Sequence, residues 1–216
     1  MVGNISQSLE EDFRSLREGW KIEMIGREQE EIWLSLKAYI HLLYRWANKL
    51  NLVSLNEIDV MATKHIWRAL AMLPYVQSVP NDTIIDVGSG SGLPAIPLKI
   101  CLPECQFYLV ESRRKRANFL REVIRSLGLK KIEVINQRIE NWSENVLGDV
   151  VTARAVANPA EIRRWTAGHV ATPSWLICTL EKSGLEVGEM GKEVECSWRG
   201  ETMRMGLIPL SYEQAE

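Results

Sequence analysis

Thr83-Ile84-Ile85-Asp86-Val87-Gly88-Ser89-Gly90-Ser91-Gly92-Leu93-Pro94-Ala95-Ile96-Pro97 decides the fold of this chain. Its first five residues are mostly β-branched or apolar, which predicts a short buried strand. Three alternating glycines follow, and Pro94 suits the first turn of a helix. Small residues that can adopt positive φ, beside the free N–H groups of a helix start, let the backbone approach a bulky cofactor closely. The stretch therefore predicts a strand, a cofactor-binding turn and a helix.

One acid, Asp86, stands in the predicted strand directly before the glycines. This position disfavours an anionic pyrophosphate and favours a cofactor with a cationic amino acid end, such as S-adenosylmethionine. We expect the turn to bind that cofactor through Asp86, Gly88, Gly90 and Gly92. Glu111 lies at a spacing that suits the ribose hydroxyls. Two alternatives stay open, because residues 90–95 also satisfy the nicotinamide and flavin pattern and because such a turn can be purely structural.

The composition is that of a soluble globular protein. The chain has 216 residues, 46% hydrophobic and 25% charged, enough for one α/β domain with a modest addition. No apolar run reaches membrane-spanning length and residues 1–5 do not look like a signal peptide, so we expect a cytoplasmic protein without a membrane partner. The net charge of −2 argues against a surface that is basic all over, but it allows a local basic face.

The four cysteines predict reduced thiols. Cys101 and Cys105 do not form a CxxC pair, and Cys178 and Cys196 each stand alone in an apolar or strand-like context. We therefore expect no disulfide, no zinc and no other bound metal.

The apolar pattern divides the chain near residue 80. Residues 1–79 are predicted to form an N-terminal helical extension, whereas residues 80–216 alternate between strands and helices. The predicted helices cover residues 8–20, 28–48, 57–73 (ended by Pro74), 94–101, 113–127 and 158–168. The predicted strands cover residues 83–87, 106–111, 132–135, 149–153, 175–180, 194–198 and 203–210. This order predicts a doubly wound, mostly parallel sheet, and the terminal strand pair fits methyltransferases better than dehydrogenases.

Several further segments come in the order and spacing of one known family. They are Tyr44-Arg45-Trp46 through Asn51-Leu52, Lys64-His65, Glu111-Ser112, Lys115-Arg116 with Phe119-Leu120, Arg138-Ile139-Glu140, and Asp149 through Ala155. With the glycine stretch, they make residues 44–157 resemble the bacterial small-subunit rRNA guanine-N7 methyltransferases, also called the glucose-inhibited division protein B family. The resemblance implies a Rossmann-like class I methyltransferase domain with an antiparallel last strand, S-adenosylmethionine as donor, and 16S rRNA or the small ribosomal subunit as partner. Separately, we expect a monomer.

The resemblance also implies roles by position. Gly88 and Leu93 would border the methionine and ribose of the donor, Ile139 and Glu140 would flank its adenine, and Arg154 would face the reacting end as the candidate catalytic residue. Guanine N7 carries an in-plane lone pair, so it can attack a methyl group without losing a proton and needs no general base. The alternative for Arg154 is a surface ion pair.

Several positions depart from the family pattern. Ala95 replaces a glycine, Ala47 an asparagine and Val53 a threonine; Trp67-Arg68-Ala69 stands where an acid and a serine are usual, and Glu181 through Gly184 lacks the usual Lys-Gly pair. Two other functions therefore stay open: a methyltransferase with another RNA or small-molecule acceptor, and an inactive module that binds S-adenosylmethionine or the ribosome.

Two further features have more than one interpretation. The run Arg113 to Arg116, with its basic neighbours up to Lys131, could contact RNA phosphates or form the ordinary exposed side of a helix. His65 lies on an apolar helix face, so we expect a packed, hydrogen-bonded histidine and not a catalyst. We assign no tryptophan to RNA.

Overall fold

The computed structural model describes residues 7–20, 29–50, 55–180 and 191–210. Residues 51–54 and 181–184, which were named above for the family resemblance or for departures from it, lie outside the described part, as does the side chain of Ala47.

The described chain folds around a seven-stranded mixed sheet with the strand order β3-β2-β1-β4-β5-β7-β6. The strands are β1 (Thr83–Val87), β2 (Gln106–Val110), β3 (Ile132–Ile135), β4 (Gly148–Ala153), β5 (Val170–Thr179), β6 (Lys192–Trp198) and β7 (Glu201–Pro209). Strands β1 to β5 pair in parallel, whereas β7 runs antiparallel between β5 and β6. The expected doubly wound sheet with an antiparallel last strand is confirmed.

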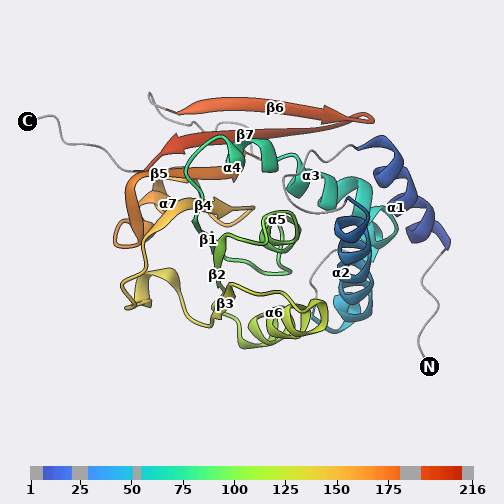
Figure 1. Ribbon diagram of the computed structural model, residues 1–216, viewed down its shortest axis with the longest axis horizontal. Helices are drawn as coiled ribbons and strands as arrows, with labels where there is room; N and C mark the ends of the chain where they lie inside the picture. The colour runs from blue at the N-terminus through green and yellow to red at the C-terminus, as the bar shows by residue number, and fades with distance from the viewer. Residues whose placement is uncertain (1–6, 21–28, 51–54, 181–190, 211–216) are drawn as a thin grey trace, which may run out of the picture.

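Helices cover both faces of the sheet (Figure 1). One face carries α5 (Ala95–Cys101) and α6 (Arg114–Leu127), and α1 (Gln7–Gly19), α2 (Gln29–Leu50) and α3 (Trp67–Leu70) lie beyond them on the same side. Helix α2 contacts both α5 and α6, and α3 contacts α5. The opposite face carries α7 (Pro159–Thr166) and the short turn η3 (Ile139–Asn141).

Alternate strand residues build two separate cores. Ile84 and Phe107 belong to a large core that includes Leu36 and Leu43 of α2, whereas Ile85 lies in a second core beneath α7. The two-residue period of a strand produces this division, since neighbouring side chains point to opposite faces. The N-terminal helices thus share one apolar core with the sheet.

Local signals set several element ends. Asn158 accepts a hydrogen bond from Glu161 N at 2.9 Å and forms a capping box at the start of α7. Gly128 ends α6 in the left-handed conformation, with φ of 63°.

Two expected elements differ. The predicted single helix over residues 57–73 is instead divided into the 3-10 turn η1 (Leu55–Val60), the π-helical turn η2 (Ala62–Ile66) and α3. Pro74 does not end this segment. It lies in the first turn of the next helix, α4 (Leu73–Gln77), where a residue without an N–H loses no helical hydrogen bond. Strand β5 begins at Val170 and not at residue 175, because the register against β4 shifts between Gly148 and Val150 and accommodates the intervening residues.

Candidate active site

The glycine turn is fastened to the end of β2. Gly88 has φ of 67°, and its N–H donates to Val110 O at 2.9 Å, while Ser89 N–H donates to the same oxygen at 3.1 Å. A Cβ on Gly88 would lie 2.8 Å from Val156 Cγ2. Both the backbone conformation and the space require glycine here, so a side chain would disturb the turn as well as the crevice beside it.

Asp86 lies beneath this turn and is 1% exposed. Thr152 Oγ1 donates to its Oδ1 at 2.6 Å, whereas Oδ2 has no hydrogen-bond partner among the described residues. Burial raises the pKa of Asp86 to about 6. A buried carboxylate oxygen without a partner is costly, so this position suits a ligand that brings a positive charge or an N–H donor.

Glu111 directly follows β2 and is 4% exposed. Gly90 N–H donates to its Oε2 at 2.9 Å, and Arg113 N–H donates to its Oε1 at 2.7 Å. The expected ribose acid therefore already connects the glycine turn to the start of α6. A carboxylate has about four acceptor sites, so both oxygens keep capacity for ligand hydroxyls.

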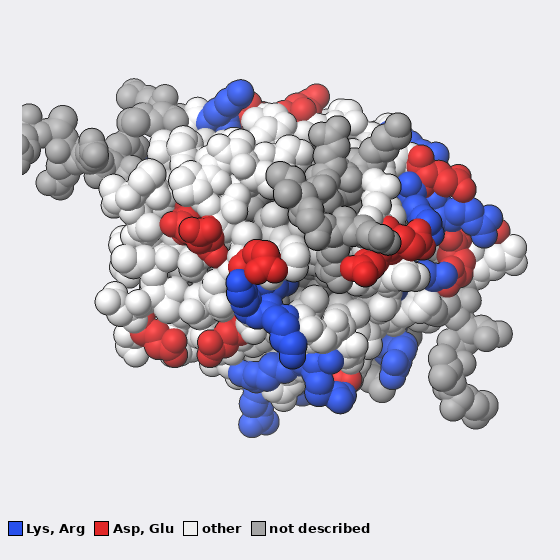
Figure 2. Space-filling view, in the orientation of Figure 1, with Lys and Arg blue, Asp and Glu red and all other residues white. Residues whose placement is uncertain are grey.

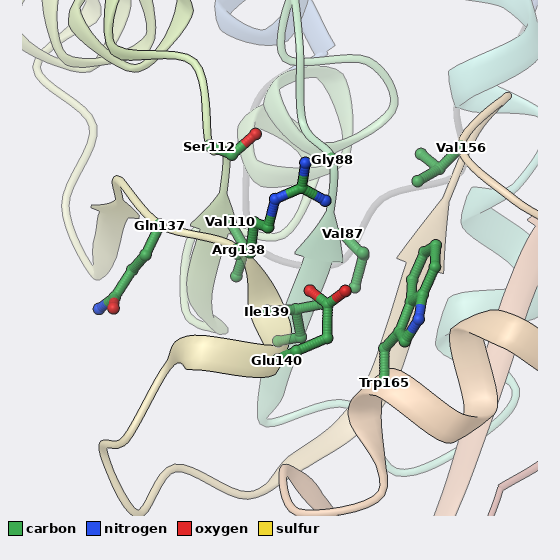
Figure 3. Close-up of a pocket in the computed structure, with 10 residues that line it drawn as sticks. All are labelled: Val87, Gly88, Val110, Ser112, Gln137, Arg138, Ile139, Glu140, Val156 and Trp165. Atoms are coloured by element: carbon green, nitrogen blue, oxygen red, sulfur yellow. The ribbon is translucent and has the colours of Figure 1, made fainter.

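Two adjoining cavities open at the carboxyl ends of the parallel strands. One, of about 360 Å³, is lined by Gly88, Gly90, Leu93, Glu111 and Arg154 together with neighbouring residues. The other, of about 230 Å³, is lined by Gly88, Ile139 and Glu140 among others (Figure 3). Val156 and Gly88 border both cavities, which therefore adjoin at the edge where ligands bind in open α/β sheets, and we call the two together the crevice.

Two expected site residues do not line this crevice. Asp86 lies below it, and Gly92 faces the protein, because a Cβ there would lie 2.6 Å from Ile96 Cγ1 and 3.2 Å from the Tyr39 hydroxyl. Gly92 thus allows the close packing of the turn against α2 and α5.

Trp165 of α7 is a lining residue that the sequence did not indicate. Its ring faces Ile139 and Glu140 across the smaller cavity (Figure 3). The available signal was the strong helix start at Asn158-Pro159, a short loop after the end of β4 at Ala153, which places α7 beside the carboxyl edge of the sheet.

Arg154 follows the last residue of β4 and lines the larger cavity. Its Nη2 donates to His65 Nδ1 at 3.4 Å, and the other ring nitrogen of His65 lies 2.9 Å from Glu57 Oε2. Burial and the charge of Arg154 lower the pKa of His65 to about 4. The expected packed, hydrogen-bonded histidine is thus confirmed, although its contact with Arg154 was not foreseen.

The basic run around Arg113 divides between the crevice and the surface. Arg113 and Arg116 line the larger cavity, whereas Arg114 and Lys115 are exposed. In the view of Figure 2, Lys and Arg side chains are gathered on the molecular surface over α6. A cationic surface therefore adjoins the crevice.

Comparison with known proteins assigns the chain to a family. Residues 33–182 match the family described as rRNA small subunit methyltransferase G. The chain belongs to this family. The family resemblance seen in the sequence is confirmed, as is the expected class of enzyme, an rRNA methyltransferase that depends on S-adenosylmethionine.

Members of the rRNA small subunit methyltransferase G family resemble the chain over most of its length. The protein of that name from Hydrogenovibrio crunogenus is 36% identical over 165 residues, which cover 76% of this chain and 74% of that protein. The one from Legionella pneumophila (strain Corby) is 40% identical over 139 residues, which cover 64% of this chain and 65% of that protein. The second match therefore spans slightly less than two thirds of its relative.

The fold extends beyond this family. A methyltransferase from Geobacter sulfurreducens superposes with a TM-score of 0.57 at 12% identity, over 86% of this chain and 99% of that one. At this identity the likeness concerns the fold alone, which is that of class I methyltransferases.

Among the described residues, no three His, Cys, Asp or Glu side chains are grouped as a metal site would require. Within the same ranges, no helix combines the length and apolar character needed to cross a membrane. The four cysteines are free thiols.

Proposed function

We propose that the protein transfers a methyl group from S-adenosylmethionine to N7 of a guanine in 16S rRNA. One observation carries the proposal: in a member of the rRNA small subunit methyltransferase G family, a crevice that Arg154 lines opens beside a glycine turn, above the buried Asp86 carboxylate.

The described residues fit the donor. The Asp86 oxygen without a partner would attract the ammonium group, and Glu111 would accept from the ribose hydroxyls. The adenine would lie between Ile139 and Trp165, next to Glu140. Bound in this way, the donor supplies an electrophilic methyl group on a sulfonium sulfur.

Gly88 and Leu93 would border the methionine part of the donor. The exposed backbone of Gly88 allows close approach, and Leu93 offers an apolar wall. Gly90 would lie beside the ribose, because its N–H is bound to Glu111. These contacts would align the methyl group with the acceptor and exclude water.

The acceptor nitrogen needs no base. A bond forms between N7 and the methyl carbon while the carbon–sulfur bond breaks and its electron pair stays on sulfur. A guanidinium bound to N7 would block the attacking lone pair. Arg154 would therefore bind guanine O6, an RNA phosphate or the donor carboxylate, and thereby orient the reactants.

Labelled-methyl transfer tests this proposal. Small ribosomal subunits and stripped 16S rRNA are each incubated with methyl-labelled S-adenosylmethionine, and the product is digested to identify the labelled nucleoside. We expect 7-methylguanosine. Label in another nucleoside, or donor binding by calorimetry without any transfer, contradicts the proposal and favours another acceptor or an inactive module.

Arg154→Ala gives the first prediction. We expect transfer to fall about 10²-fold, because misorientation of the reactants is costly, while the melting temperature changes little. Arg163→Ala on α7, a half-buried arginine outside both cavities, is the control. Equal losses of activity and stability would indicate a structural role for Arg154.

Packing also explains the unusual segment after His65, which had suggested another acceptor. Trp67 is fully buried and stacks on Trp198 with ring centroids 6.1 Å apart. Arg68 Nη2 lies 3.2 Å from Glu201 Oε2. These contacts give Trp67 and Arg68 a packing role against the β6–β7 hairpin.

The proposed acceptor, 16S rRNA, also implies a binding partner and a cellular compartment for the protein. We propose that the protein acts as a monomer on the small subunit or its RNA, in the cytoplasm where ribosomes assemble. Light scattering with and without the subunit measures both the oligomeric state and complex formation.

A further inference from the structure

Three side chains from distant parts of the chain form a line that ends in the crevice. Glu57 comes from η1, His65 from η2, and Arg154 from the end of β4. Glu57 Oε2 lies 2.9 Å from His65 Nε2, and His65 Nδ1 lies 3.4 Å from Arg154 Nη2. The first two side chains therefore connect the N-terminal segment to the residue proposed to orient the reactants.

The chemistry of Arg154 determines which ring nitrogen of His65 carries the proton. A guanidinium can only donate, so His65 Nδ1 must accept. The ring proton then lies on Nε2 and is donated to Glu57, whose other oxygen is held by Lys64 Nζ at 2.6 Å. Only the neutral imidazole with its proton on Nε2 satisfies both contacts.

The backbone around His65 is shaped to make these contacts. Residues Ala62–Ile66 form a π-helical turn, a widened geometry that is frequent at functional sites. Asp12 of α1 holds its start by accepting from Ala62 N–H at 2.7 Å and also from Thr63. The turn buries His65, which is 8% exposed, and directs its ring toward Arg154.

We propose that His65 and Glu57 are positioning residues that hold the Arg154 guanidinium in place where it lines the crevice. This inference rests on the proposed function of Arg154. An arginine side chain loses about 2 kcal/mol of rotamer entropy when it is ordered. A neutral acceptor beneath it provides this order before the reactants bind and leaves the guanidinium charge available to them.

Two substitutions of His65 by neutral amide side chains test the contacts that join Glu57, His65 and Arg154. In His65→Asn the amide can place its oxygen where Nδ1 lies, so that Arg154 keeps its acceptor. In His65→Gln the amide extends toward Nε2 and Glu57, so that the acceptor for Arg154 is lost. We expect His65→Asn to transfer methyl groups within about threefold of the wild-type rate and His65→Gln to be at least about tenfold slower.

For each His65 variant we measure single-turnover methyl transfer to small subunits, donor affinity by calorimetry, and the melting temperature. The same three measurements are made on double variants that also carry Arg154→Ala. We expect His65→Gln to slow Arg154→Ala no further, because the two changes remove the same interaction. Wild-type transfer by His65→Gln, equal losses in the Asn and Gln variants, or additive losses with Arg154→Ala would each overturn the inference.

Failure of the proposed function would look different. If Arg154→Ala itself transferred at the wild-type rate, the role of Arg154 would be wrong and the positioning inference would fall with it. If Arg154→Ala were slow while His65→Gln was not, only the positioning inference would fail. Should His65→Gln not fold, Glu57→Ala, which removes the acceptor for His65 Nε2 at a more exposed position, replaces it, and a rate equal to wild type would contradict the inference.

Discussion

Asp86 shows how a single residue can be poorly placed for stability and well placed for binding. Its carboxylate is 1% exposed, and only one of its oxygens has a hydrogen-bond partner among the described residues. Burial raises its pKa from 3.8 to about 6, so at neutral pH the folded protein holds a charge that would be more stable in water. The ligand's positive charge would remove that cost.

Asp86→Asn gives the second prediction. Asparagine carries no charge and can still accept from Thr152, but its NH2 group takes the buried place of Oδ2, which has no partner among the described residues. The gain from losing the charge is offset in part by the unpaired N–H groups, so we expect the free energy of unfolding at pH 7 to rise by at most about 2 kcal/mol. The pKa is raised on folding, so the wild-type penalty is complete above about pH 6 and vanishes as the pH falls toward 3.8. The gain should vanish over the same range.

Urea unfolding across that pH range and calorimetry with S-adenosylmethionine measure the two effects of Asp86→Asn. Donor affinity should fall although stability rises. The exposed Asp82→Asn is the control and should change neither. A variant that lost both stability and affinity would show that the Asp86 charge supports the fold.

At the scale of elements, α7 and α2 each supply one contact to the crevice that local sequence patterns do not reveal. Trp165 of α7 forms the wall opposite Ile139. Tyr39 of α2 is fully buried, and its hydroxyl donates to Ser91 O in the glycine turn at 2.7 Å. Both helices therefore shape the donor site from outside the strand–turn–helix unit.

Trp165→Ala gives the third prediction. Removal of the ring opens one side of the adenine pocket, so we expect donor affinity to fall about tenfold. Stability should change less, because Trp165 is only partly buried. Arg164→Ala, an exposed neighbour on the same helix, is the control for calorimetry. Unchanged affinity would place the adenine elsewhere.

Tyr39→Phe gives the fourth prediction. It removes only the hydroxyl that holds Ser91 O, so we expect the free energy of unfolding to fall by about 1 kcal/mol. Donor affinity should fall as well, because the turn loses its support from α2. Tyr44→Phe on the same helix is the matched control, and equal donor affinity in both variants would show that the turn needs no such support.

Individual residues explain how far the sequence could predict this structure. The strands β1 to β4 follow from short apolar runs, and residues of the strand ends, such as Gly88 and Arg154, meet because parallel strands end at one edge. The contact between His65 and Arg154 joins residues 89 positions apart. The π-helical turn depends on Asp12 from another helix. No local pattern encodes such contacts.

At the scale of the whole molecule, the N-terminal helical segment packs against the turn between β6 and β7. Trp67 and Trp198 stack, Trp20 meets both rings edge-on, and Arg68 pairs with Glu201. The N-terminal helices are therefore bound to the sheet both through α5 and α6 and through the β6–β7 hairpin.

Trp198→Ala gives the fifth prediction. We expect a loss of about 2–3 kcal/mol in the free energy of unfolding, since a half-buried ring is removed from the cluster. Glu201→Gln breaks the Arg68 ion pair, which is partly exposed, and should cost less than about 1 kcal/mol. Urea unfolding compares the two, and a larger loss for Glu201→Gln would mean that charge dominates this contact.

The shared apolar core has a practical consequence for anyone who wishes to divide this enzyme. Helix α2 packs on α5 and α6, and α3 packs on α5, within the same core that covers Ile84 and Phe107. We expect a fragment that starts at residue 80 to expose the apolar outer sides of α5 and α6 and to aggregate. The strand-containing part of the chain therefore cannot be separated from the N-terminal helices and fused to another RNA-binding domain.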